Sequence, residues 1–164
     1  MLAVVSDSSP LIYFTRLGIF PALRQLHERV LVPPAVWQEI TVGGAGREEE
    51  QNVRRAAAEG WIQVQAPAVQ HAELKARTDL GRGEIEAILL ARQLQAVLLT
   101  DDAAARETAR NFSVLVTGTV GLLVRLKSEG HVASIQPLLD ALRRTNFRMS
   151  ETLYRNALSQ AHEN

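Results

Sequence analysis

Hydrophobic residues gather in five short runs along the chain, and polar residues or glycines bound each run. Short runs rich in valine and leucine are typical of strands that are buried on both faces, as in a parallel sheet. The pattern therefore predicts five strands, at about residues 2–6, 29–32, 61–65, 96–100 and 113–117.

Between these runs, apolar residues recur at helical spacing and cap residues stand at the segment ends. Asp7, Ser8 and Ser9 form an N-cap cluster before Pro10, and Gly18 ends the helix that follows. We expect further helices at about 20–27, 35–41, 46–59, 84–95, 120–129, 133–144 and 150–161. Strands that alternate with helices predict an α/β fold, a three-layer α/β/α sandwich around a central, mainly parallel sheet of four or five strands.

The length and composition fit a single domain over residues 1–164, in which the helices at about 133–161 form a C-terminal extension. This extension either packs on the sheet or forms an arm for a partner. The chain has no cysteine, which excludes disulfides, thiolate metal sites and cysteine nucleophiles. It also shows no apolar run as long as a membrane span and no signal-peptide pattern, so we expect a cytoplasmic protein.

The charges balance, with 18 basic and 18 acidic side chains. A protein that coats nucleic acid is usually basic, so any contact with nucleic acid has to use a local patch. The acidic residues are more informative, because several of them follow predicted strands. Asp7 follows the first strand, and Asp101 and Asp102 follow the fourth. In open parallel sheets, ligands bind beyond the carboxyl ends of the strands, so these carboxylates are expected at one edge.

Three glutamates extend this acidic set. Glu39 lies in the helix after Pro33 and Pro34, whereas Glu84 and Glu86 lie just after a glycine-rich turn. Such carboxylates also cap helices or favour the helix dipole, and each one alone has that simpler interpretation. Carboxylates that gather on one edge repel each other unless a cation lies between them, and Mg²⁺ or Mn²⁺ prefers such oxygen ligands. The set therefore predicts a site for one or two divalent metal ions.

Other phosphate and hydrolase chemistries lack their required residues. A phosphatase of the Asp-x-Asp type needs a second aspartate where Ser9 stands, and a phosphoreceiver domain needs a lysine after the strand that ends at Val116. No histidine accompanies a serine in a nucleophile elbow. The Gly81-Arg82-Gly83 turn lacks the lysine of a phosphate-binding loop.

Five segments resemble the PIN-domain nuclease family, and in particular a subfamily of short prokaryotic proteins similar to the VapC-type toxins. The segments, in chain order, are VVSDSSPLI at 4–12, VPPAVWQEI at 32–40, LGRGEIEAI at 80–88, LLTDD at 98–102 and VTGTVG at 116–121. The order and spacing of these segments carry the resemblance. One departure is the glutamate in the third segment, where VapC-like toxins commonly have aspartate.

The resemblance implies a metal-dependent endoribonuclease, with Mg²⁺ or Mn²⁺ held by an acidic quartet that matches Asp7, Glu39, Glu84 and Asp101. Glu86 and Asp102 remain alternatives to their neighbours as metal ligands, and Glu84 is preferred because it lies nearer the glycine turn. Substrate contacts are assigned to Ser8, Ser9, Thr117 and Arg82. The implied partners are an RNA substrate, an antitoxin protein and a second copy of the chain in a homodimer. The rival hypothesis is a PIN fold without catalysis that binds RNA or a protein.

Overall fold

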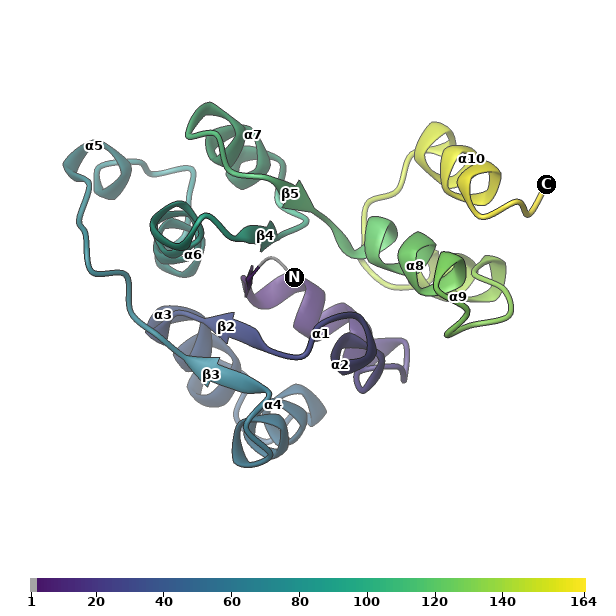
Figure 1. Cartoon of the computed structure of the whole chain (residues 1–164), viewed down its shortest axis with the longest axis horizontal. Helices are drawn as coiled ribbons and strands as arrows, with labels where there is room; N and C mark the ends of the chain where they lie inside the picture. Colours follow the sequence, from purple (N-terminus) through teal and green to yellow (C-terminus); the bar gives the residue numbers. More distant parts are fainter. Residues whose placement is uncertain (1–2) are drawn as a thin grey trace.

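The computed structural model describes residues 3–164, and its centre is a sheet of five parallel strands in the order β3-β2-β1-β4-β5 (Figure 1). In the register, Val5 pairs with Leu31 on one side and with Leu98 on the other. The strands are β1 (Val4–Ser6), β2 (Val30–Val32), β3 (Ile62–Val64), β4 (Val97–Leu99) and β5 (Val116–Thr117). The expected parallel α/β sheet is confirmed, although Leu2 of the first expected strand lies outside the described residues.

Alternate strand residues point into two separate cores, which explains the continuous apolar runs. Val4 and Leu99 face a core shared with α1 and α8, whereas Val5 and Leu98 face a core built by α6 and α7. Helices therefore cover both faces of the sheet, as the α/β/α prediction requires.

The helices match the expected segments closely and add two. They are α1 (Ser8–Arg16), α2 (Ala22–Leu26), α3 (Pro34–Gln38), α4 (Glu48–Ala58), α5 (Ala72–Lys75), α6 (Arg82–Leu94), α7 (Ala103–Asn111), α8 (Thr119–Ser128), α9 (Gln136–Arg143) and α10 (Glu151–Gln160). The sequence pattern did not delimit α5 and α7. The helix expected at 35–41 continues beyond α3 as a π-helical turn, η1 (Glu39–Gly43).

The C-terminal helices pack onto the molecule and do not project from it as an arm. Figure 1 shows α8, α9 and α10 together on one side of the molecule, beyond α1. Leu139, Leu142 and Ala157 are buried in the same core as Phe14 of α1. The apolar residues of these helices thus pack mainly against other parts of the same chain. In the described part of the chain, no helix has the length and apolar character needed to cross a membrane.

The sheet order places the ends of β1 and β4 side by side at the point where the chain changes direction across the sheet. After β1 the chain builds outward to β2 and β3, and it later returns to add β4 and β5 on the other side of β1. The Asp7 N–H donates to the Leu99 carbonyl at 3.0 Å, and the Thr100 N–H donates to the Thr117 carbonyl at 3.0 Å. Three strand ends thus meet at one edge, where ligands of open α/β sheets bind.

Candidate active site

Asp7 lies directly after β1 and is the N-cap of α1. Its carboxylate accepts hydrogen bonds from the Ser9 N–H at 3.1 Å and the Ser9 hydroxyl at 3.0 Å, and the Thr100 hydroxyl donates to its other oxygen. The residue is only 4% exposed. Burial raises the pKa of Asp7 from 3.8 to about 7, although the donors from Thr100 and Ser9 favour the charged form; the nearby charge of Asp101 raises this pKa further.

Asp101 and Asp102 follow β4 and have different partners. The Asp101 carboxylate accepts hydrogen bonds from the N–H and from the hydroxyl of Thr119, each at 2.6 Å. These bonds link Asp101 to the first residue of α8. Burial raises the pKa of Asp101, and the hydrogen bonds from Thr119 oppose that shift. Asp102 is the N-cap of α7, where it accepts the Ala105 N–H at 2.8 Å. One member of the doublet therefore caps the next helix, as the sequence analysis had allowed.

Glu39 begins the π-helical turn η1 and reaches toward two other segments. Its carboxylate accepts hydrogen bonds from the Ser8 hydroxyl and from the Gly83 N–H, the latter at 3.2 Å. A Cβ at Gly83 would collide with the Glu39 carboxylate. Glycine at this position therefore lets the carboxylate lie against the first turn of α6. Turns of π-helix are frequent at functional sites.

Glu84 and Glu86 point in different directions, as two residues of a helix that are two positions apart should. Glu84 accepts the Gly81 N–H at 2.8 Å and faces the other acidic residues; burial raises its pKa, and the charges of Asp102 and Glu39 add to the shift. Glu86 instead accepts the Ala35 N–H at 2.8 Å, at the start of α3. The structure places Glu84 at the acidic edge and Glu86 outside it.

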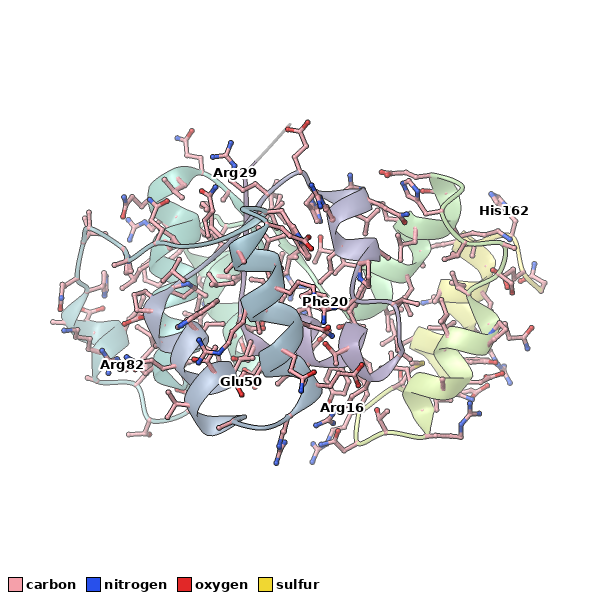
Figure 2. The ribbon with its side chains drawn as sticks, turned by 90° about the horizontal axis from the view of Figure 1, so that it is seen from below. Arg16, Phe20, Arg29, Glu50, Arg82 and His162 are labelled. Atoms are coloured by element: carbon pink, nitrogen blue, oxygen red, sulfur yellow. The ribbon has the colours of Figure 1, made fainter. Side chains whose placement is uncertain are left out.

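A cavity of about 690 Å³ brings the acidic residues together. It is lined by Asp7, Ser8, Ser9, Ile12, Tyr13, Arg16, Glu39, Glu84, Asp101, Asp102, Ala103, Asn146, Phe147 and Arg148. Of the residues assigned to substrate contact, Ser8 and Ser9 line it. Thr117 lines a neighbouring cavity of about 430 Å³. Arg82 lines neither: its side chain is 77% exposed and pairs with Glu86 at 3.5 Å, and Figure 2 shows it well apart from Arg16.

The donor set of the cavity fits a hard divalent cation. Asp7, Glu39, Glu84, Asp101 and Asp102 all line it, and within residues 3–164 none of them forms an ion pair with lysine, arginine or histidine. The raised pKa values of Asp7 and Asp101 have burial as their main cause, and a bound cation would favour the charged forms.

The side chains are nevertheless not arranged around a metal position. Among the described residues, no three acidic or histidine side chains are grouped so that they could hold a metal ion. The physical reason lies in their present partners. Asp101 is turned to Thr119, Glu84 to Gly81, and Glu39 to Ser8 and Gly83. Metal binding would require some of these carboxylates to rotate away from their present donors.

The structure adds residues to the cavity that the sequence analysis did not single out. One is Thr100, whose hydroxyl donates to Asp7. Others lie on one face of α1, where Ile12, Tyr13 and Arg16 follow Ser9 at helical spacing and line the cavity. The sequence could have predicted that these residues lie together, because positions three, four and seven residues apart share a helix face.

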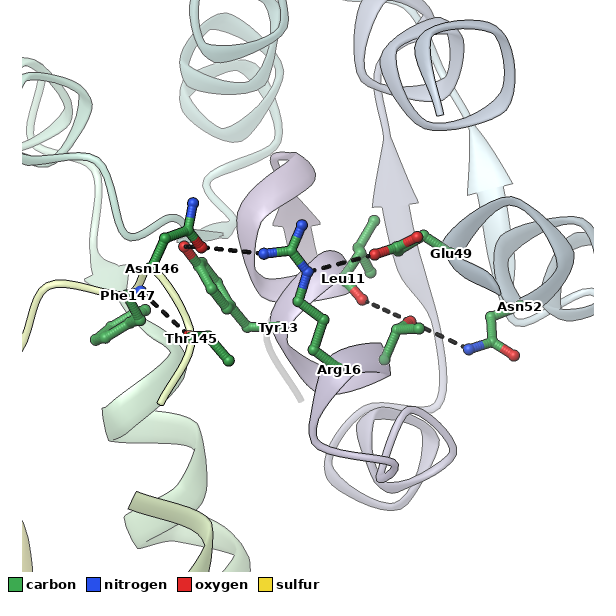
Figure 3. A network of polar contacts seen from close by, with 9 residues as sticks. Leu11, Tyr13, Arg16, Glu49, Asn52, Thr145, Asn146 and Phe147 are labelled. Atoms are coloured by element: carbon green, nitrogen blue, oxygen red, sulfur yellow. Dashed lines mark hydrogen bonds and ion pairs between the residues drawn. The ribbon is translucent and has the colours of Figure 1, made fainter. Parts of the chain in front are cut away.

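The segment between α9 and α10, residues 144–150, closes one side of the cavity. The Asn146 side-chain carbonyl accepts hydrogen bonds from the Tyr13 hydroxyl at 3.1 Å and from Arg16 at 3.0 Å (Figure 3). The Phe147 ring packs edge-on against the Tyr13 ring, with 4.9 Å between centroids. No local pattern in the sequence signals these contacts, because the partners are at least 130 positions apart.

Comparison with known proteins places this chain in a family. A family model described as a PIN domain matches residues 3–163. The chain belongs to the PIN-domain family. PIN domains are generally nucleases and usually bind a divalent metal ion, so the resemblance noted in the sequence is confirmed at the level of the family.

A solved structure agrees with this assignment. This PIN domain has the fold of a PilT N-terminus domain protein from the hyperthermophilic archaeon Sulfolobus solfataricus P2, with a TM-score of 0.50. The two share 15% sequence identity, over 91% of this chain and 100% of the other, and at that identity the likeness bears on the fold alone. Comparison with curated proteins finds no match.

Proposed function

We propose that this PIN domain is a metal-dependent endoribonuclease that hydrolyses RNA phosphodiesters. One observation carries the proposal: four carboxylates from four separate segments of the chain, Asp7, Glu39, Glu84 and Asp101, line a single cavity. The segments are the same ones that resemble the acidic motifs of PIN nucleases. The cavity lies at the switch point of the sheet, where α/β enzymes bind their ligands.

Asp7, Glu39, Glu84 and Asp101 would hold one or two Mg²⁺ or Mn²⁺ ions. When bound, such a cation supplies a Lewis acid that polarises the phosphodiester and favours ionisation of the attacking water. The chain's own groups position these acids. Thr100 and Ser9 hold the carboxylate of Asp7 by three donated hydrogen bonds.

The remaining cavity residues suit an anionic substrate. Ser8, Arg16 and Arg148 line the same cavity as the acids. Guanidinium groups match the geometry of phosphate oxygens, so arginines at this cavity suit the phosphates of an RNA strand. Arg16 pairs with Glu49 at 3.6 Å, whereas Arg148 forms no ion pair in the described part of the chain, so Arg148 supplies the unpaired positive charge of this cavity.

The test is cleavage of a 5′-labelled, unstructured RNA with Mn²⁺ or Mg²⁺, compared with EDTA. We expect metal-dependent cleavage by the wild type and a loss of at least about a hundredfold in Asp7→Asn and Asp101→Asn, because metal ligands act as a set. The matched control is Glu73→Gln, which neutralises an exposed carboxylate on α5 and should cleave as the wild type does. Equal cleavage by Asp7→Asn and the wild type would overturn the proposal.

The absence of a ready metal position among the described residues favours one alternative, a PIN fold that binds RNA or a protein without catalysis. Metal titration separates the two functions. If Mn²⁺ leaves the melting temperature of the wild type unchanged while RNA still binds, the binding function holds and the nuclease proposal fails.

We further propose a role as the toxin of a toxin–antitoxin pair, with an antitoxin protein as partner and a homodimer as the assembly. Growth arrest on expression of the wild type, relieved in Asp7→Asn, tests the toxin role. Copurification with the product of a neighbouring gene tests the antitoxin, and light scattering after gel filtration tests the dimer.

A further inference from the structure

The acidic cavity continues into a second cavity, and the two share three lining residues. The second cavity measures about 430 Å³ and lies between the end of β5, α8 and α10. Asp101, Phe147 and Arg148 line both cavities. A polymer that has one phosphodiester at the acidic residues can therefore extend past Arg148 into the second space.

The chemistry of the second cavity differs from that of the first. Its charged residues are Asp101, Arg106 and Arg148, so its balance is basic, whereas five carboxylates line the first cavity. Apolar side chains and two amide side chains complete its wall: Val116, Val120, Val124, Leu153, Ala157, Asn156 and Gln160. Apolar surface beside guanidinium and amide groups suits a nucleotide, whose base packs on apolar atoms and whose phosphate takes a cation.

Arg148 is available for such a contact. Its side chain forms no ion pair and no hydrogen bond in the described part of the chain. Its backbone is nonetheless fixed on the N-terminal side, because Asn146 is held by Tyr13 and Arg16 and Phe147 packs on Tyr13. A held backbone places the guanidinium at the junction of the cavities before any ligand binds.

Arg106 lines the second cavity, and a hydrogen bond to the backbone already orients its side chain. Its guanidinium donates to the Thr100 carbonyl at 3.1 Å. A Cβ at Gly118 would stand 2.7 Å from this guanidinium and 2.8 Å from the Asp101 carboxylate. Glycine thus lets both side chains lie against the backbone at the point where the two cavities meet.

We propose that the second cavity is a subsite for the nucleotide next to the cleaved phosphodiester, and that Arg148 binds the phosphate of that nucleotide. This inference rests on the proposed ribonuclease function, which it deepens by assigning the path of the RNA strand. The C-terminal segment then supplies the arginine that binds the substrate phosphate. The strand ends after β1 and β4, together with η1 and α6, supply the metal ligands.

The experiment measures binding of a 12-nucleotide labelled single-stranded RNA by fluorescence anisotropy over a range of salt concentrations. All proteins carry Asp7→Asn so that the RNA stays intact. We expect Arg148→Gln to weaken binding about tenfold and to reduce the slope of log affinity against log salt by about 0.7, the value for one phosphate contact to a single strand. Arg144→Gln is the matched control, since Arg144 lines neither cavity, and it should change neither quantity.

A second variant shows whether weaker binding by Arg148→Gln reflects the lost cation or a change in folding. Asn156→Asp adds a negative charge to the second cavity from an exposed position on α10, and we expect it also to weaken RNA binding about tenfold. Asn164→Asp, the same change at another exposed residue, should bind as the parent does. Affinities and salt slopes that are equal in Arg148→Gln and Arg144→Gln, with Asn156→Asp also neutral, would overturn the subsite.

The two proposals fail in different ways. If a protein with Asp7 intact cleaves the same RNA with Mn²⁺ but Arg148→Gln and Asn156→Asp bind it normally, only the subsite falls. If that protein does not cleave the RNA with Mn²⁺ or Mg²⁺, the ribonuclease function falls and the subsite falls with it.

Discussion

Replacement of Asp7 with asparagine removes a buried negative charge and keeps a side chain of nearly the same shape. Burial raises the pKa of this carboxyl from 3.8 to about 7, so ionisation of Asp7 destabilises the folded protein. A difference of about three pKa units corresponds to about 4 kcal/mol of unfolding free energy above pH 7. Removal of the charge should therefore stabilise the metal-free protein.

The direction of the pH dependence follows from proton binding. Between about pH 4 and pH 7 the folded state holds the Asp7 proton and the unfolded state has lost it. Stability of the wild type therefore falls as the pH rises through this window, and the loss is complete above pH 7. Asparagine does not titrate. We expect Asp7→Asn to be more stable than the wild type by up to about 4 kcal/mol at pH 8 and by less than about 2 kcal/mol at pH 5.

Urea denaturation in EDTA, followed by the fluorescence of Trp37 and Trp61, measures these free energies. Asp79→Asn is the control, because its exposed pair with Arg77 is of a kind that contributes about 1 kcal/mol or less at any pH in this range. Mn²⁺ at a hundred times its dissociation constant should then stabilise the wild type by about 2.7 kcal/mol and leave Asp7→Asn unchanged.

Two results would refute this reasoning. One is an Asp7→Asn protein that is no more stable than the wild type at pH 8. The other is a stability difference that is the same at pH 5 and pH 8, which would mean that the substitution acts through packing and not through a buried charge.

Three further substitutions probe the supports of the site. Gly83→Ala should keep stability within about 1 kcal/mol but reduce RNA cleavage at least tenfold, because the new Cβ displaces the Glu39 carboxylate. Thr100→Val should lower the unfolding free energy by about 1–3 kcal/mol and move the acid limb of the pH–rate profile to higher pH, since its hydroxyl lowers the pKa of Asp7. Glu163→Gln should cost about 1 kcal/mol and increase hydrogen exchange at the start of α9, where the carboxylate accepts backbone N–H groups.

Matched controls accompany these three changes. Gly81→Ala places its Cβ in ordinary contact, 3.7 Å from Glu84, and should cleave RNA as the wild type does. Thr108→Val removes a buried hydroxyl far from Asp7 in sequence and should leave the pH–rate profile in place. Glu73→Gln changes an exposed glutamate and should not affect exchange in α9. Full cleavage by Gly83→Ala, an unmoved profile in Thr100→Val, or unchanged exchange in Glu163→Gln would contradict the corresponding contact.

Local pattern predicted most of the secondary structure but not all of its boundaries. The five strands followed from apolar runs, which are strong signals because both sheet faces are covered. The short helix α5 has four residues, too few to show periodicity. The apolar residues of helix α7 are all alanines, which give no strong apolar stripe, and its N-cap Asp102 was its clear local signal. The helix at Pro34 changed to a π-helical turn at Glu39, which no propensity indicates.

The sequence by itself determined which segments bring acids to the sheet edge, because strand ends and helix starts are readable from local pattern. Only the tertiary structure decided which acids share the cavity. It turned Glu84 toward the cavity and Glu86 toward Ala35, and it made Asp102, which also lines the cavity, the N-cap of α7.

The tertiary structure also brought in Asn146, Phe147 and Arg148, which contact or lie beside residues more than 130 positions earlier in the chain. The physical reason is that periodicity reports each residue relative to its neighbours along the chain. Which residues meet at a site depends on the strand order and on how α9 and α10 fold back over α1 and α8. Long-range packing determines both.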